Sequence, residues 1–383
     1  MGKTLSSSRA VLTAEPLRRL AKMRVARFED YGGIAELQSR NGLTARSYDE
    51  WSGLWTDNPA YGRGDDQLPI GWILEGSAGE VGGYLGNLPL MYELGGREVL
   101  AATPYSWVVD PAFRSHSLEL LRRFLRQDRV DLFISTTPNA AAEKVYRAFG
   151  FSKVASGRWD RAGFWITGYR GFAFSALRAA SMPWAGLLAY PLSALLFLKD
   201  ALSQSRLPAG GVDFELCAGF DSRFDTFWEE LKSENPGSLL AVRTRESLDW
   251  HFRTGLAKHT VRVLAVTRDG RLLAFAVFIR QDHPELQLQR YRFADFQALR
   301  GFEGLLRPVL DWMLDSCRRE HIHVVENPGC WLERFGVAGT RPPYHRRLQP
   351  WSFYYWTGNQ DLFGRLQDPN VWSPSSFEGD TTL

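Results

Sequence analysis

The chain has 383 residues, which at about 150 residues per domain corresponds to two or three domains that can bury cores without disulfides or metals. Hydrophobic residues make up 44% and charged residues 23% of the chain. These values are near globular averages and exclude a disordered, collagen-like or coiled-coil protein. The 46 basic and 43 acidic side chains leave a formal charge of +3, too small for a dedicated nucleic-acid binder of this length.

The cysteines and the N-terminus indicate the compartment. Cys217, Cys317 and Cys330 are odd in number and widely spaced, which argues against a secreted disulfide framework and favours a reducing cytoplasm. Residues 1–23 are basic and lack the apolar core of a signal peptide. We therefore expect a cytoplasmic protein that begins with a flexible basic arm over residues 1–23.

Hydrophobic periodicity and turn residues predict the elements of the first half. In chain order these are a strand at 24–28, helices at 31–38 and 47–55, strands at 69–75, 81–94 and 98–109, a helix at 117–127, a strand at 132–136 and a helix at 140–149. Leu118, Leu121 and Leu125 define the expected apolar face of the helix at 117–127. This order predicts a mixed α/β domain over residues 24–170.

A similar order begins near residue 212. Its predicted elements are a strand at 214–216, a helix at 221–232, a hairpin formed by 261–267 and 271–280, a strand at 286–295, a helix at 308–319 and a strand at 321–325. The same order of elements predicts a second domain of the same kind over residues 212–383.

The stretch at 171–211 joins the two predicted domains and is strongly hydrophobic. Residues 182–198 carry no charge and include Pro183 and Pro191, but 17 residues are fewer than the roughly 20 that a membrane-spanning helix needs. Two interpretations remain open. A buried interdomain helix pair is slightly favoured. The alternative is an interfacial segment, with Trp184 and Tyr190 at the headgroup level, that makes peripheral contact with the inner face of the membrane.

The most informative residues follow the strand at 132–136. They are Asn139, Ala142, Tyr146, Gly150 and Phe151. Ala142 and Tyr146 are four residues apart and share a helix face, and Gly150 ends that helix. An asparagine at the helix start either caps the helix or binds a ligand amide. From spacing alone, a capped amphipathic helix with a packed tyrosine is the ordinary outcome.

This pattern resembles the GNAT superfamily of acyl-CoA-dependent N-acetyltransferases, whose members carry Asn-x-x-Ala-x-x-x-Tyr-x-x-x-Gly-Phe in the helix after the fifth strand. All five named positions match. Residues 109–114 are similar to the end of the family's fourth strand and the start of its pyrophosphate loop. The resemblance covers residues 24–169 and implies an α/β fold of two GNAT-like domains, each a mostly antiparallel mixed sheet flanked by helices. The second domain lacks the motif and is expected to be degenerate.

The resemblance also implies a donor and its binding residues. The donor is acetyl-CoA or another acyl-CoA. Backbone amides of the fourth strand bind the pantetheine arm, here at Trp107, Val108 and Val109. The pyrophosphate meets the loop and helix start formed by Arg114, Ser115, His116, Ser117 and Leu118, where unpaired amides favour an anion. Asn139 matches the position that contacts pantetheine, and Tyr146 matches the general acid that protonates the coenzyme thiolate.

The predicted phosphate loop departs from the family pattern. The family has Arg or Gln-x-x-Gly-x-Gly or Ala, whereas this chain has Ser117 and Glu119 at the two small positions. Serine is a tolerable replacement, but a carboxylate repels a pyrophosphate unless it points away. An ordinary helix capped by Ser117 remains the alternative. No general base is assigned, although Glu93, Asp110, Tyr105 and His116 lie in the right region of the sequence.

Metal binding is not expected. Cys317, His321, His323 and Cys330 are residue types that zinc prefers, but their spacing matches no common structural zinc site.

The sequence therefore predicts an enzyme that moves an acetyl or related acyl group from acyl-CoA to an amine, on a small molecule or a saccharide, bound between the two halves. No nucleic-acid partner is expected, and the oligomeric state is open. The alternatives are a Fem-type aminoacyl transferase and a catalytically inactive GNAT-fold binding module.

Overall fold

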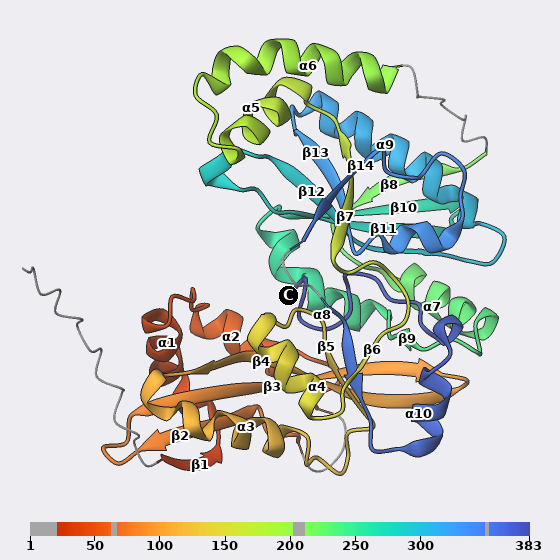
Figure 1. The fold of residues 1–383 in the computed structure, drawn as a ribbon. Coiled ribbons are helices and arrows are strands. Elements are labelled where there is room, and N and C mark those ends of the chain that lie inside the picture. The colour runs from red at the N-terminus through yellow and green to blue at the C-terminus, as the bar shows by residue number, and fades with distance from the viewer. Residues whose placement is uncertain (1–20, 63–66, 202–210, 349–351) are drawn as a thin grey trace, which may run out of the picture. The chain divides into compact units, whose positions relative to one another are not determined.

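A computed structural model describes residues 21–62, 67–201, 211–348 and 352–383 (Figure 1). Most of the predicted basic arm therefore lies outside the described residues. The chain divides into two compact units. Of the described residues, unit 1 comprises 21–49, 69–87 and 104–127, and unit 2 comprises 50–62, 67–68, 88–103, 128–201, 211–348 and 352–383. Strands β3 (Val81–Leu94) and β4 (Arg97–Val109) each contribute one part to each unit.

Unit 1 is a small sheet packed against helix α3. Strand β1 (Ala21–Val25) pairs antiparallel with β2 (Gly71–Gly76), and β2 pairs with β3 in the register Gly71↔Gly86. Helix α1 (Tyr31–Arg40) and a 3-10 turn, η2 (Pro111–His116), complete the unit. The predicted apolar face of α3 (Ser117–Phe124) is right for Leu121 and wrong for Leu118, because the helix buries Leu120, Leu121 and Phe124. Leu118 is exposed.

Unit 2 contains part of the first sheet. Strand β9 (Leu240–Ala241) pairs with the end of β3, and β5 (Leu132–Ser135) runs parallel to the start of β4. Strand β15 (Tyr354–Trp356) lies between β5 and β6 (Ser152–Lys153). This unit also contains helices α4 (Ala140–Ala148) and α10 (Gln360–Leu366) and most of α2 (Tyr48–Thr56), whose first two residues belong to unit 1.

The second sheet lies wholly in unit 2. Its order is β14 (Tyr344–Arg347), β7 (Arg161–Ile166), β13 (Val324–Pro328), β12 (Arg290–Ala298), β11 (Arg271–Arg280), β10 (Val261–Arg268) and β8 (Asp213–Cys217). Only β12 and β13 pair in parallel. The helices of this region are α5 (Tyr169–Ala179), α6 (Ala185–Ala201), α7 (Ser222–Glu234), α8 (Arg245–Ala257) and α9 (Leu306–Arg319). The predicted architecture of mostly antiparallel mixed sheets flanked by helices is confirmed.

The two sheets exchange strands. β7 belongs to the first half of the sequence but pairs with β13 and β14 of the second sheet. β15 comes from the C-terminal region but pairs with β5 and β6 of the first sheet. Each exchanged strand satisfies backbone groups along a strand that would otherwise be a sheet edge. The division of the chain at residues 170 and 212 stays a prediction, and sheet membership does not follow it.

The hydrophobic stretch folds into a helix pair, α5 and α6, in which α6 lies over α5 (Figure 1). Only Ala189 and Asp200 of α6 are buried. The slightly favoured expectation of a buried helix pair is therefore wrong for α6. Of the helices in the described ranges, none combines the length and the apolar character needed to cross a bilayer.

A buried ion-pair network lies at the centre of unit 2. Arg243, which is 1% exposed, donates to both carboxylate oxygens of Asp295 at 2.7 and 3.2 Å. Its guanidinium also reaches Glu378 at 3.4 Å and the carbonyl of Ala241 at 2.7 Å. Burial opposes ionisation of Asp295, but Arg243 holds its pKa below the ordinary value. Burial raises the pKa of Glu378, so Asp295 is the principal counter-charge of Arg243.

This network predicts a large effect of removing one charge. Arg243→Met leaves Asp295 buried without its cation and is expected to lower the free energy of unfolding by about 3–5 kcal/mol. The double variant Arg243→Met/Asp295→Leu is expected to recover most of that loss, and exposed Arg97→Met to change stability by less than about 0.5 kcal/mol. Urea unfolding measures all three. Equal losses for Arg243→Met and Arg97→Met would contradict the assignment.

Candidate active site

Asn139 stands at the start of the helix that carries the motif. Its backbone is extended, and its side-chain oxygen accepts hydrogen bonds from the backbone N–H groups of Ala141 at 3.1 Å and Ala142 at 2.9 Å. The residue is exposed. The geometry therefore gives Asn139 a capping role through its oxygen, while the contact of its amide with pantetheine stays a prediction.

Tyr146 lies on the buried side of the same helix. The residue is 2% exposed, and its ring packs against Phe151 at a centroid distance of 4.7 Å and Tyr354 at 6.3 Å. Burial raises the pKa of Tyr146, although a hydrogen bond with Ser135 acts in the opposite direction. Gly150, with φ +81°, ends the helix and returns the chain towards Phe151. The phenol is therefore neutral at physiological pH, as a proton donor must be.

The parallel pairing beside this helix is short. β4 and β5 pair only through Ala101↔Leu132 and Ala102↔Phe133, although β4 runs on to Val109. Thr103, the next residue of β4, is fully buried, and its hydroxyl has no hydrogen-bond partner among the described residues. The pantetheine contacts predicted from the sequence lie on β4 after this point, where β4 no longer pairs with β5.

The predicted pantetheine residues Trp107, Val108 and Val109 form the end of β4 in unit 1. Ser106, directly before them, has φ +53° and accepts a hydrogen bond from Gln38 at 2.6 Å. A non-glycine residue with this φ is uncommon and marks a local irregularity of the strand.

The predicted phosphate loop follows in the same unit. Arg114, Ser115 and Leu118 are exposed, and His116 and Ser117 are half-buried. Phe113 anchors the loop, since its ring lies 2.4 Å from where a Cβ on Gly82 would stand. The alternative of a helix capped by Ser117 is wrong. Ser117 already has helical dihedrals, His116 occupies the cap position, and His116 forms no capping hydrogen bond through its side chain.

Glu119, the unexpected residue of this loop, faces His116. The carboxylate lies 3.4 Å from Nδ1 of His116. Asp110, considered as a base, instead accepts hydrogen bonds from Arg40 at 2.9 Å and Asn41 at 2.7 Å. Asp110 therefore serves to hold α1 against the end of β4.

The sequence did not reveal a pocket that lies entirely in unit 2. It is a small pocket, in which the centre of a water molecule can occupy about 30 Å³. The lining residues come from the chain after α2, the end of β3, β9, α8 and the C-terminal segment, and include Asn58, Tyr92, Trp250, His251, Phe377 and Glu378. No local motif joins five distant segments, which is why sequence reasoning missed it.

Tyr92 and His251 are among the deeply buried polar residues of this pocket. The hydroxyl of Tyr92 has no hydrogen-bond partner in the part of the chain that the structure describes. Such groups are rare in folded proteins because each loses its hydration without replacement. The imidazole of His251 packs on the ring of Phe377, with the ring centroids 4.5 Å apart. Its Nε2 lies 2.7 Å from the hydroxyl oxygen of Thr382. Burial lowers the pKa of His251 to about 3, so its imidazole is neutral.

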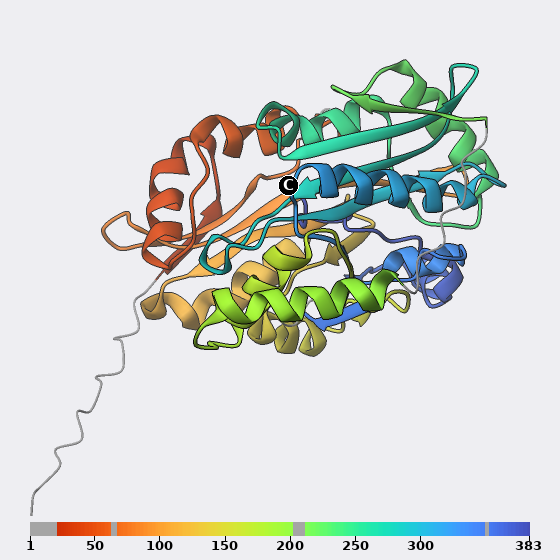
Figure 2. The ribbon, with the colours of Figure 1, turned by 90° about the horizontal axis from the view of Figure 1, so that it is seen from above.

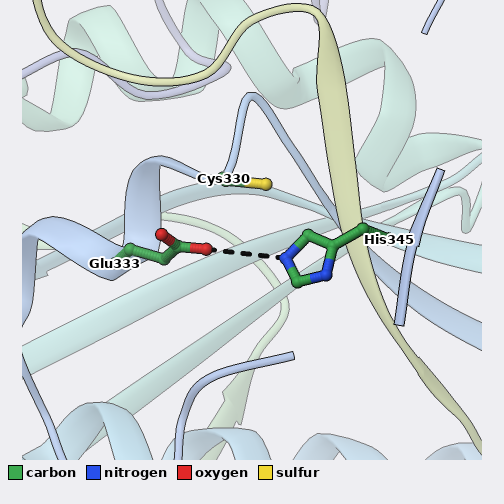
Figure 3. Close-up of side chains that lie close together, drawn as sticks. All are labelled: Cys330, Glu333 and His345. Atoms are coloured by element: carbon green, nitrogen blue, oxygen red, sulfur yellow. Dashed lines mark ion pairs between the residues drawn. The ribbon is translucent and has the colours of Figure 1, made fainter. Parts of the chain in front are cut away.

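A cluster of potential metal ligands lies elsewhere in unit 2. Cys330, Glu333 and His345 have ligand atoms within 4.8 Å of one another (Figure 3). Glu333 is already paired with Arg158 and lies 3.7 Å from His345. Burial raises the pKa of the Cys330 thiol. A neighbouring guanidinium and a protonated thiol both oppose binding of a divalent cation, so the absence of a metal stays our prediction.

Solved structures resemble this chain in fold. The GCN5-related N-acetyltransferase from Anabaena variabilis ATCC 29413 matches 89% of this chain and 73% of its own, with a TM-score of 0.55 at 12% identity. Saccharomyces cerevisiae N-myristoyltransferase with bound myristoyl-CoA matches 90% of this chain and 81% of its own, with a TM-score of 0.52 at 10% identity. A probable N-acyltransferase from Enterococcus faecalis V583 matches 88% of this chain and 73% of its own, with a TM-score of 0.52 at 9% identity.

The sequence itself matches no protein-family model and no curated protein. At these identities the solved structures establish the fold. The chain has the GNAT fold, which confirms the expectation from the motif around Tyr146.

The two possible roles of Asn139 are separable by experiment. Asn139→Ala removes the cap and is expected to cost about 0.5–2 kcal/mol of stability, whereas Asn139→Asp keeps an accepting oxygen and is expected to retain stability. Urea unfolding measures the cap. If the amide also binds pantetheine, Asn139→Asp weakens acyl-CoA binding in calorimetry at unchanged stability. An unaltered unfolding midpoint for Asn139→Ala would refute the capping role.

Proposed function

We propose that this protein transfers an acyl group from a coenzyme A thioester to an amine. The observation that carries the proposal is a buried, neutral Tyr146 on helix α4, which is hydrogen-bonded to Ser135 at the end of β5, within a GNAT fold. The solved N-myristoyltransferase of the same fold holds myristoyl-CoA. That likeness supports an acyl-CoA donor and leaves both acetyl and longer acyl groups as candidates.

The proposed reaction begins when a neutral amine attacks the thioester carbonyl. The carbonyl π electrons move to oxygen, and a tetrahedral intermediate forms. Its collapse restores the carbonyl and breaks the C–S bond, and the amide nitrogen loses a proton to solvent. The leaving thiolate takes the proton of the Tyr146 hydroxyl, and solvent then reprotonates the phenolate. Burial suits Tyr146 to this step because a buried phenol holds its proton until an adjacent anion appears.

The donor is proposed to lie along β4, with Trp107, Val108 and Val109 contacting pantetheine. The pyrophosphate would meet residues 114–118, at the start of the eight-residue helix α3. The contact of Glu119 with His116 at 3.4 Å supports this placement, because it holds the carboxylate towards the imidazole ring of the same loop.

The amine acceptor is proposed to occupy the pocket of unit 2. Trp250, Phe377 and His251 supply aromatic surface, which suits the apolar face of a saccharide ring. Glu378 and the unpartnered hydroxyl of Tyr92 supply polar groups in the same pocket. These features favour a small amino group that enters the pocket, carried on a small molecule or a saccharide.

The second sheet is proposed to be a degenerate copy that binds no donor. Its parallel pair, β12 and β13, is registered from Arg290↔Val324 to Arg292↔Glu326. Beyond this pairing, aromatic side chains pack against β12. The ring centroids of Phe293 and Trp331 are 6.4 Å apart, and those of Phe296 and Phe335 are 5.0 Å apart. We also propose a cytoplasmic location, supported by three free and buried cysteine thiols.

Calorimetric titration with acetyl-CoA and myristoyl-CoA tests donor binding directly. An inactive binding module is the second candidate, because the predicted phosphate loop lacks both small residues and carries Glu119. Binding of either thioester supports the transferase. Failure of both to bind would favour the inactive module.

Tyr146→Phe is expected to lower kcat by about a hundredfold, because the thiolate leaves without its proton donor, while donor affinity stays unchanged. Thioester consumption and calorimetry measure the two quantities. Tyr355→Phe is the matched control, since it removes another buried hydroxyl, which is hydrogen-bonded to Leu366 at 3.2 Å. Unchanged turnover in Tyr146→Phe would remove this residue from the mechanism.

Tyr92→Phe separates binding from folding. Because the Tyr92 hydroxyl is buried and unpartnered among the described residues, its removal is expected to leave stability unchanged or raise it by up to about 1 kcal/mol. If the hydroxyl contacts the acceptor, the KM for glucosamine as acceptor probe rises at least about fivefold. Steady-state kinetics and urea unfolding measure the two effects. An unchanged KM would exclude Tyr92 from the acceptor site.

A further inference from the structure

Helix α6 presents a broad apolar surface that the rest of the described chain leaves uncovered. We call it the outer face of α6, formed by Met182, Trp184, Leu187, Leu188, Tyr190, Leu195, Phe197 and Leu198. Trp184, Leu187, Leu195 and Leu198 are 76%, 67%, 66% and 63% exposed. Figure 1 shows α6 beyond α5, and Figure 2 shows it along its length from above. Exposed apolar side chains gathered in this way mark an interaction surface.

The opposite side of α6 is firmly attached. Ala185, Ala189, Leu192 and Leu196 follow helical spacing and are buried or half-buried. Asp200 continues this side and accepts hydrogen bonds from the hydroxyls of Tyr169 at 3.0 Å and Tyr344 at 2.8 Å. The helix is therefore held in one orientation, with its outer face directed away from α5.

The exposed charges that residues 161–201 contribute have one sign. Arg170, Arg178 and Lys199 are exposed, and the guanidinium of Arg170 lies 4.4 Å from the ring centre of Tyr190. Between residues 161 and 201 the only carboxylate is Asp200, which is buried and bonded to two tyrosines. A second copy seated on this face by two-fold symmetry would bring the same cations of residues 161–201 close to one another. An anionic lipid surface supplies the missing negative charge.

We infer that the outer face of α6 docks onto an anionic lipid bilayer, with the helix lying in the plane of the interface. Leucine and phenylalanine side chains then enter the boundary of the acyl chains. Trp184 and Tyr190 place amphipathic rings at headgroup level, and Arg170, Arg178 and Lys199 meet the phosphates. This inference is independent of the proposed acyl transfer.

Flotation of the full-length protein with vesicles tests the docking. The protein is expected to float with vesicles of phosphatidylcholine mixed with phosphatidylglycerol, more weakly with phosphatidylcholine alone, and less at high salt. Leu188→Glu/Leu195→Glu places two carboxylates in the outer face and is expected to lower the partition coefficient at least about tenfold. Leu216→Glu, at a 54% exposed leucine of β8, is the matched control and is expected to float like the parent.

Charge is tested in the same assay. Arg178→Glu is expected to weaken flotation with the anionic vesicles severalfold, whereas Arg97→Glu, on β4, is expected to leave it unchanged. Circular dichroism verifies that each variant is folded. The inference is overturned if the parent does not float with anionic vesicles or if Leu188→Glu/Leu195→Glu floats equally well. It is also overturned if light scattering shows a lipid-free dimer that this double variant converts to monomer.

Discussion

Arg243 imposes the main constraint on unit 2, because a buried guanidinium must keep its counter-charges within reach. Asp295 comes from β12 of the second sheet, and Glu378 comes from the C-terminal segment. Arg243 itself follows β9, which pairs with the end of β3 beside Tyr92. Arg243 thus ties the chain after β9 to the C-terminal segment, and residues of both line the pocket. The network therefore joins three separate parts of the chain, of which two contribute residues to the pocket.

The exchanged strand β15 forms part of the surroundings of Tyr146, the candidate general acid. β15 pairs with β5, and its Tyr354 packs beside Tyr146 and donates a hydrogen bond to Glu143 at 2.6 Å. A strand from the C-terminal region therefore helps to bury the phenol whose neutrality the proposed chemistry needs. The surroundings of Tyr146 are completed only when residues more than two hundred positions away have folded against it.

The outer face of α6 shows how composition alone misleads about burial. Residues 182–198 are uncharged, and a helix that is apolar on all sides is normally buried or in a membrane. Here one side packs through Ala189 and Asp200, whereas Trp184 and Leu195 remain exposed. An apolar surface held in one orientation and bordered by cations suits lipid headgroups better than it suits solvent.

Local sequence determined the helix that carries Tyr146, its end at Gly150 and, through the motif, the GNAT fold, because capping, periodicity and a positive φ act over a few residues. It misplaced Leu118 on the apolar face of α3 and the cap at Ser117, where neighbouring elements decide which side is buried. The pocket around Tyr92 and the exposure of α6 were decided only by tertiary structure. Both depend on contacts between distant segments, which no short stretch of sequence encodes.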